Sequence, residues 1–239
     1  MKSLRSLIIA TSHNNPEDLA RSTGVWLEDF AAAYFMLKDG GEYITVASPA
    51  GGQIPTDPRS KYPGASTKNT LRFATDSQAM YHFAHSLPLN EIKPEYFDLL
   101  FLAGGYGAMW DFPADKNLQR IIKYFVHQNK PVGFVGHAAA ALTLLTLENK
   151  EPFVKGRKLT AFSNSEELSI EPSGIFPFSL ESALCSLGAL YSKTTDFNSY
   201  VITDGNIITG QNPASTTEVA VQLLLVARAR IKITATKTA

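Results

Sequence analysis

A strand that runs directly into a helix constrains the fold of this chain more than any other feature. Residues 132–135 form a short apolar run of strand type, and a helix-forming run of alanines begins at Ala138. Only Gly136 and His137 separate the two, which leaves no room for a loop. The pattern predicts a nucleophile elbow, in which one residue adopts a strained backbone conformation at the carboxyl end of a sheet and faces the next helix. That residue is Gly136, which has no side chain.

Strand-like and helix-like segments alternate along the rest of the chain. We expect strands at residues 7–11, 42–47, 97–102, 132–135, 158–162, 200–203 and 207–209. We expect helices at residues 25–37, 118–128, 138–147, 180–190 and 215–227. This alternation predicts an α/β fold of flavodoxin-like type, with a mostly parallel central sheet and helices on both faces. In such folds the ligand site lies beyond the carboxyl ends of the strands. This rule selects four expected loops, which are the one after Leu102, the elbow, residues 163–167 and residues 210–215.

The 239 residues suit one large domain. We expect it to cover residues 1–230, with a small cap inserted at about 50–95, because a Gly- and Pro-rich stretch precedes a helical pattern there. The last residues are basic and Thr-rich, so we expect an exposed tail at 231–239.

Composition excludes several classes of function. The formal net charge is zero, which gives a nucleic-acid partner no electrostatic support. No apolar stretch approaches the ~20 residues that cross a bilayer, so we expect no membrane partner. The single cysteine, Cys185, cannot form an intrachain disulfide, and this fits a cytoplasmic location. Its neighbours Leu184 and Leu187 favour a buried, structural Cys185.

Five motifs, in order along nearly the whole chain, resemble the ThiJ/PfpI superfamily. They lie at residues 23–30, 47–52 with 55–58, 103–113, 131–142 and 209–215. The resemblance implies a domain like that of class I glutamine amidotransferases, and its nearest branch is the heat-inducible chaperone and glyoxalase III group. The elbow of that family reads approximately Cys-His-Gly-Pro-Ala-Ala-Leu. Here Gly136 stands in place of the nucleophilic cysteine, and two alanines replace the following Gly-Pro.

The resemblance assigns roles to the residues around the elbow. His137 matches the catalytic base, and Glu167 matches the acid that orients it, with Glu166 as the alternative one position away. Glu28 matches a buried glutamate that contacts the thiol, whereas the adjacent Asp29 suits the exposed face of its helix. The structural alternatives are a hydrogen-bonded turn histidine at 137 and solvated carboxylates at 167 and 28.

Other candidates would shape the ligand site. Gly104 and Gly105 follow a predicted central strand, and their backbone N–H groups can approach an anionic atom as an oxyanion hole requires. The alternative is a tight strand-to-helix turn. Tyr106 stands where the family usually has histidine, and Asn212 is expected in the pocket wall.

We expect no metal and no cofactor. His82, His85 and Glu91 lie in the predicted cap, but their spacing is not specific for a metal. The glycines at 104–107 lack the dinucleotide-binding spacing.

The missing nucleophile leaves three functions open. The first is a stress-related, catalytically degenerate protein that binds a small carbonyl compound or an anion, or acts as a holdase chaperone. The second is a hydrolase or lyase in which His137 and Glu28 activate water. The third is residual glyoxalase III, deglycase or amidase activity, although covalent catalysis lacks its sulfur. Relatives of this kind are often homodimers, but no surface patch identifies an interface.

Overall fold

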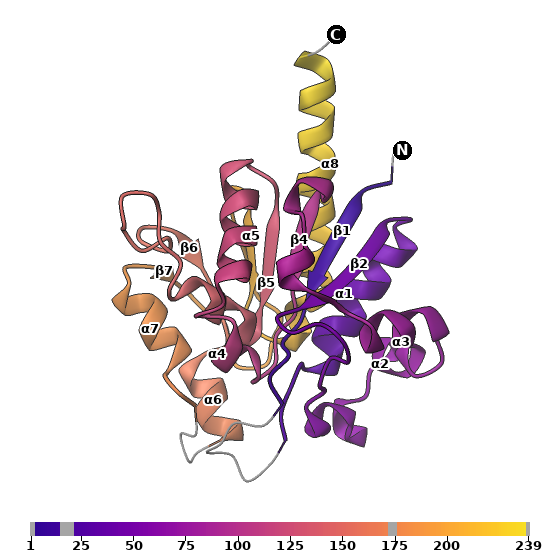
Figure 1. The fold of residues 1–239 in the computed structure, drawn as a ribbon. Coiled ribbons are helices and arrows are strands. Elements are labelled where there is room, and N and C mark those ends of the chain that lie inside the picture. Colours follow the sequence, from indigo (N-terminus) through magenta and orange to yellow (C-terminus); the bar gives the residue numbers. More distant parts are fainter. Residues whose placement is uncertain (1–2, 15–21, 172–175, 238–239) are drawn as a thin grey trace.

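The computed structural model describes residues 3–14, 22–171 and 176–237, and it centres on one seven-stranded sheet (Figure 1). The order of the strands is β3-β2-β1-β4-β5-β9-β8. All neighbouring pairs are parallel except the antiparallel hairpin of β8 and β9. The strands are β1 (Arg5–Ile9), β2 (Tyr43–Ser48), β3 (Leu87–Pro88), β4 (Leu99–Leu102), β5 (Val132–Val135), β8 (Val201–Asp204) and β9 (Ile207–Gly210).

Helices lie on both faces of this sheet. The α-helices are α1 (Leu27–Asp39), α2 (Lys68–Phe73), α3 (Ser77–Ala84), α4 (Ala108–Asp111), α5 (Lys116–His127), α6 (Asn164–Ile170), α7 (Leu180–Ser186) and α8 (Thr216–Lys237). Two further short strands, β6 (Lys158–Leu159) and β7 (Leu190–Tyr191), pair in parallel outside the main sheet. Among the described residues, no helix has both the length and the apolar character that crossing a bilayer would require.

The central strands are buried on both faces, as their continuous apolar sequences predict. In β4, Leu100 and Leu102 belong to the core that includes α5 and the segment after β5. Leu99 and Phe101 belong to the opposite core, which includes α1 and α8. The predicted α/β architecture is therefore confirmed.

The segment between β2 and β4 carries α2, α3 and several short 3-10 turns, and β3 joins it to the edge of the main sheet. Helix α2 packs against α1. This arrangement places part of the segment beside the helix that carries Glu28 and Asp29.

Several predicted boundaries were wrong. The helix expected at 138–147 is a 3-10 helix, η5 (Gly136–Leu142), that begins at the elbow itself. The loop expected at 163–167 belongs to α6, which begins with a capping box between Ser163 and Glu166. The last helix, expected to end at residue 227, is α8 and continues to Lys237, and Figure 1 shows it projecting beyond the sheet.

Candidate functional site

The elbow forms as the sequence predicts. Strand β5 ends at Val135, and Gly136 opens η5 with φ of +54°, a left-handed conformation that favours glycine. A Cβ placed on Gly136 would have Asp29 Oδ2 at 3.8 Å, Phe162 Cδ2 at 3.9 Å and the carbonyl oxygen of Gln211 at 4.0 Å as its nearest neighbours. Position 136 therefore has space for a small side chain.

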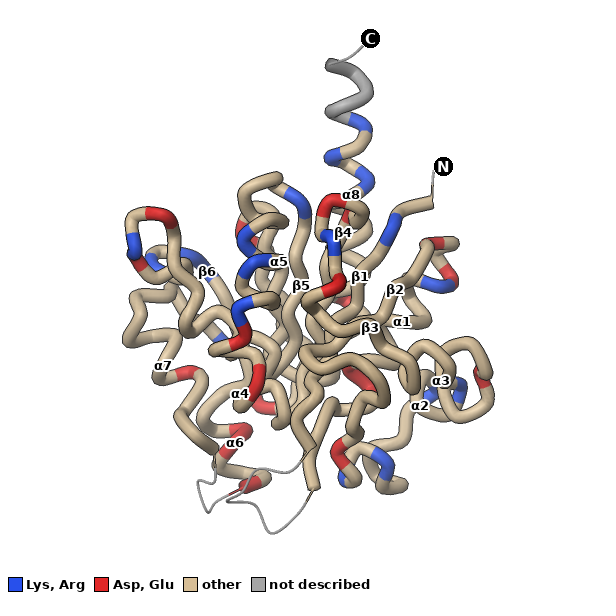
Figure 2. Tube along the Cα trace, viewed as in Figure 1, with Lys and Arg blue, Asp and Glu red and all other residues tan. Residues whose placement is uncertain are grey.

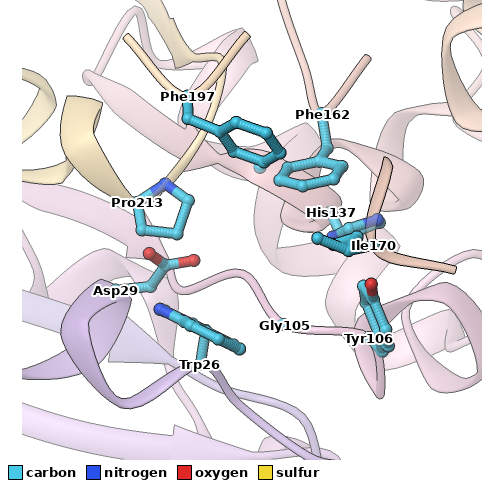
Figure 3. A pocket seen from close by; sticks show the side chains of 10 residues that line it. Trp26, Asp29, Gly105, Tyr106, His137, Phe162, Ile170, Phe197 and Pro213 are labelled. Carbon is cyan, nitrogen blue, oxygen red and sulfur yellow. The ribbon is translucent and has the colours of Figure 1, made fainter. Parts of the chain in front are cut away.

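Gly136 lines an aromatic cavity of about 150 Å³, which we call the Gly136 cavity. Figure 3 shows Asp29 and Trp26 on one side of it and His137 and Phe162 on the other. Its lining residues are Trp26, Asp29, Gly105, Tyr106, Gly136, His137, Phe162, Ile170, Phe197 and Pro213. The cavity therefore suits a ligand of a few heavy atoms.

His137 and Glu167 face each other at the wall of the Gly136 cavity. The Nε2 atom of His137 lies 3.4 Å from Oε1 of Glu167, and both side chains are buried. Within the part of the chain that the structure describes, neither atom has a close hydrogen-bond partner. The His137 ring stacks on Phe162 at 4.4 Å between centroids and meets the Tyr106 ring edge-on at 4.9 Å. These rings fix the orientation of the imidazole, as a base or hydrogen-bonding group requires.

The structure distinguishes Glu167 from the alternative Glu166. Glu166 caps the start of α6 through Ser163, and its Oε1 accepts from the backbone N–H of Phe197 and the amide of Asn212, each at 2.8 Å. Its carboxylate therefore has a structural role, because it connects the start of α6 to Phe197 and Asn212. Glu167, the next residue, is the one that faces His137.

Asp29 is the carboxyl group that faces Gly136, although its sequence position suggested an exposed helix face. Its side chain is 1% exposed. It accepts hydrogen bonds from the hydroxyl of Thr216 at 3.2 Å and from the backbone N–H of Gly104. Burial raises its pKa well above the ordinary range, and the nearby charge of Glu28 raises it further. Burial thus favours the neutral form of this carboxyl group at the cavity wall, and in that form Asp29 can donate a hydrogen bond.

Glu28 does not occupy the place that the resemblance implied. Its carboxylate accepts from the hydroxyl of Thr67 and, at 3.0 Å, from the amide of Asn69. Successive helical residues point about 100° apart, so Glu28 and Asp29 cannot share one direction. Asp29 is among the buried residues of α1 and Glu28 is not, so Asp29 is the carboxyl group that points toward the cavity.

Gly104 and Gly105 are positions where the backbone approaches the site closely. A Cβ on Gly104 would lie 2.5 Å from both Asp29 Oδ2 and the carbonyl oxygen of Val135. A Cβ on Gly105, at φ of +117°, would lie 2.3 Å from the backbone nitrogen of Trp26. The tight turn predicted as the alternative role is thus present. The backbone N–H of Gly104 donates a hydrogen bond to Asp29, whereas Gly105 lines the cavity.

Tyr106 and Asn212 contribute in different ways. The buried Tyr106 ring lines the Gly136 cavity, and the guanidinium of Arg59 lies 4.4 Å from its centroid. The side chain of Asn212 instead donates to Glu166 and to the carbonyl oxygen of Asn198, each at 2.8 Å. Asn212 therefore supports the site wall and does not line this cavity.

The prediction that Cys185 is buried was wrong. Cys185 is exposed on α7, and Leu180 and Leu184 form the buried side of that helix. It does not line the Gly136 cavity. Among the described residues, no three His, Cys, Asp or Glu side chains gather as metal ligands do. In the predicted cap, His82 contacts the hydroxyl of Tyr34, and His85 contacts the carbonyl oxygen of Tyr81.

The raised pKa of Asp29 predicts a measurable pH dependence. Between the unfolded value of about 4 and the higher folded value, the folded state holds one more proton than the unfolded chain. The free energy of unfolding therefore falls as pH rises, by up to ~1.4 kcal/mol per pH unit. Asp29→Asn removes this pH-dependent loss, so the stability of the variant relative to the wild type should increase as pH rises above about 4.

Urea unfolding of both proteins at several pH values tests this prediction. The informative quantity is the difference in unfolding free energy between the two proteins at each pH. The buried Asp111, with a pKa raised to about 7, adds a pH dependence of its own, but this contribution is the same in both proteins and cancels in the difference. A difference that does not change with pH would contradict the assignment of a raised pKa to Asp29.

The fold and the elbow define an α/β protein with a nucleophile-elbow site. A model of the DJ-1/PfpI family matches residues 24–225. The chain belongs to the DJ-1/PfpI family, which confirms the resemblance to the ThiJ/PfpI superfamily.

Relatives with assigned names include fission-yeast glyoxalases. The chain is 26% identical over 234 residues to glutathione-independent glyoxalase hsp3101 of Schizosaccharomyces pombe, covering 91% of this chain and 94% of the relative. It is 31% identical over 144 residues to the probable glutathione-independent glyoxalase hsp3103 of the same organism, covering 57% of this chain and 55% of the relative. The structure of Rapid Encystment Protein 24 KDa of Francisella tularensis superposes with a TM-score of 0.89 at 31% identity, covering 94% of this chain and 99% of that one.

Proposed function

We propose that this protein binds a small carbonyl compound in the Gly136 cavity without forming a covalent bond to it. The observation that carries the proposal is that position 136 lies at the cavity wall, in elbow geometry, and has no side chain. Covalent attack on a carbonyl carbon needs a nucleophile such as a thiolate there. The single cysteine of the chain, Cys185, is on the surface of α7.

The polar groups of the cavity favour a neutral carbonyl compound over an anion. A protonated Asp29 can donate to a carbonyl oxygen, and His137 offers a second polar contact beside Glu167. The remaining wall is mostly aromatic and apolar, which suits the methyl or methylene part of a small ketone or aldehyde. The named glyoxalase relatives act on small molecules of this chemical kind, and this supports the proposal by analogy.

Binding of hydroxyacetone, an unreactive analogue of methylglyoxal, tests this function. We expect saturable binding in calorimetry and in ligand-detected NMR. His137→Phe keeps the ring contacts but removes the polar atoms, so its affinity should fall about tenfold. Glu28→Gln is the matched control and should bind as the wild type does, because Glu28 faces Thr67 and Asn69. Absent binding, or equal binding by His137→Phe, would contradict the proposal.

A second function is favoured by the His137–Glu167 pair, which borders open space at Gly136. In this alternative the protein is a hydrolase or lyase in which the pair activates a water molecule, with Asp29 in the role first expected of Glu28. Turnover that depends on His137 separates it from simple binding. A cytoplasmic location and a homodimer belong to the same proposal, and cell fractionation and light scattering test them.

A further inference from the structure

A second cavity adjoins the Gly136 cavity and has a different chemical character. It measures about 310 Å³, and we call it the Glu28 cavity. The two cavities share Trp26, Phe197 and Pro213 as lining residues. The other residues that line the Glu28 cavity are Glu28, Ala65, Thr67, Asn212, Ala214 and Thr217. An elongated ligand can therefore place one end beside Gly136 and the other beside Glu28.

Consecutive carboxyl groups of α1 serve the two cavities. Asp29 faces Gly136 and is buried, whereas Glu28 turns toward α2 and is partly exposed. Each oxygen of Glu28 accepts one hydrogen bond, from Thr67 or from Asn69. A carboxylate has about four acceptor positions, so these two bonds fix its orientation and leave capacity for further donors.

The negative charge of Glu28 is not balanced by the lining residues. Neither cavity has Lys or Arg among the described residues that line it. Arg59 lies against the Tyr106 ring, but its guanidinium is paired with Asp57 at 2.6 Å. Figure 2 shows other basic residues along α5, on the projecting end of α8 and in the region of α2 and α3. The charge of Glu28 also acts inward, since it helps to raise the pKa of Asp29. An anionic group would be repelled here, and a cation would be attracted.

Aromatic side chains line the junction between the two cavities. Figure 3 shows Pro213 between Phe197 and Trp26. The face of an aromatic ring, and that of Trp most of all, attracts ammonium groups within ~6 Å. Aromatic faces that lead to an unneutralised carboxylate form a surface suited to a small cation.

We propose that the ligand of the Gly136 cavity carries, in addition to its carbonyl group, a positively charged amine that lies between Trp26 and Phe197 and contacts the carboxylate of Glu28. The inference rests on the proposed function, because it extends the same ligand from one cavity into the next. The ligand class is thus an amino-ketone or amino-aldehyde that is cationic at neutral pH.

Methyl ketones that end in a dimethylammonium group test the inference, with one to four methylene groups as the spacer. The isosteric ketones that end in an isopropyl group are the neutral controls. A tertiary amine cannot condense with the ketone group of a second ligand molecule, so the ligand does not react with itself during calorimetry. At the best spacer length we expect the cation to bind the wild type about tenfold more tightly than its isostere. Glu28→Gln should remove most of this preference and leave the affinity of the neutral ketone unchanged.

Glu218→Gln is the matched control, since it removes one carboxylate from an exposed position on α8 outside both cavities. It should keep the full preference for the cation. Equal affinities of cation and isostere for the wild type would overturn the inference and leave the proposed function intact. A preference that survives in Glu28→Gln would overturn it as well. If neither series binds and hydroxyacetone also fails, the proposed function fails together with the inference.

Discussion

Replacing Gly136 with cysteine is expected to give the protein a methylglyoxal-consuming activity at least about 100-fold above that of the natural sequence. The space around position 136 accepts a Cβ, and the side chain would lie between Asp29 and Phe162. A thiol at an elbow is activated by the following helical turn and by an adjacent histidine, and its thiolate adds to the aldehyde carbon. His137 is already next to position 136, with its ring held by Phe162 and Tyr106 and its Nε2 atom 3.4 Å from Glu167 Oε1.

Two companion variants make this result specific. Gly136→Ser places a weaker nucleophile at the same point and should stay near the wild-type rate. His137→Phe in the Gly136→Cys background should remove the gained activity. A folded Gly136→Cys protein with a free thiol and no turnover would show that the site lacks more than the sulfur atom.

Substitution by alanine should destabilise the protein to very different extents at the different glycines of the site. Gly105→Ala is expected to lower the free energy of unfolding by about 3 kcal/mol or more. Its Cβ would lie 2.3 Å from the backbone nitrogen of Trp26 and 2.4 Å from the carbonyl oxygen of Gly24. Backbone atoms cannot yield without moving the segment that leads into α1.

Gly136→Ala should cost only about 1–2 kcal/mol, the ordinary penalty of a left-handed conformation, because no atom lies within van der Waals overlap of its Cβ. Gly205→Ala is the matched control, with φ of +62° and no atom within 4 Å of the added Cβ. Urea unfolding with comparable m-values compares the three variants. Equal losses for Gly105→Ala and Gly205→Ala would contradict the close approach at Trp26.

The elbow could be predicted from the sequence because its signal is local. An apolar strand that meets a run of alanines with two residues between them allows one compact geometry, and Gly136 at φ of +54° confirms it. The order of strands and helices likewise follows from alternation of apolar segments, since each parallel pair needs a helical crossover.

It was harder to predict from the sequence that Asp29, and not Glu28, faces Gly136. A surface helix shows a polar face, but α1 is buried on nearly every side by the sheet, α8 and α2. The available signal was the spacing of Asp29 to Ala33 and Leu37, which places all three on one buried stripe. The capping box of Ser163 and Glu166 was another readable signal, and it marks the start of the α6 helix that was expected as a loop.

The end of helix α8 was mispredicted for a different reason, which concerns the residues after 227. Threonine has low helix propensity, but the Arg, Lys and Ala residues of this segment favour a helix, and the segment continues a helix that the core already stabilises through Val219 and Leu223.

The central claim is that the Gly136 cavity binds carbonyl compounds without chemical conversion. Lactate released from methylglyoxal by the wild-type protein at high concentration tests it most directly. We predict no lactate above the rate in buffer. Robust turnover that His137→Phe abolishes would contradict the claim and establish the water-activating alternative.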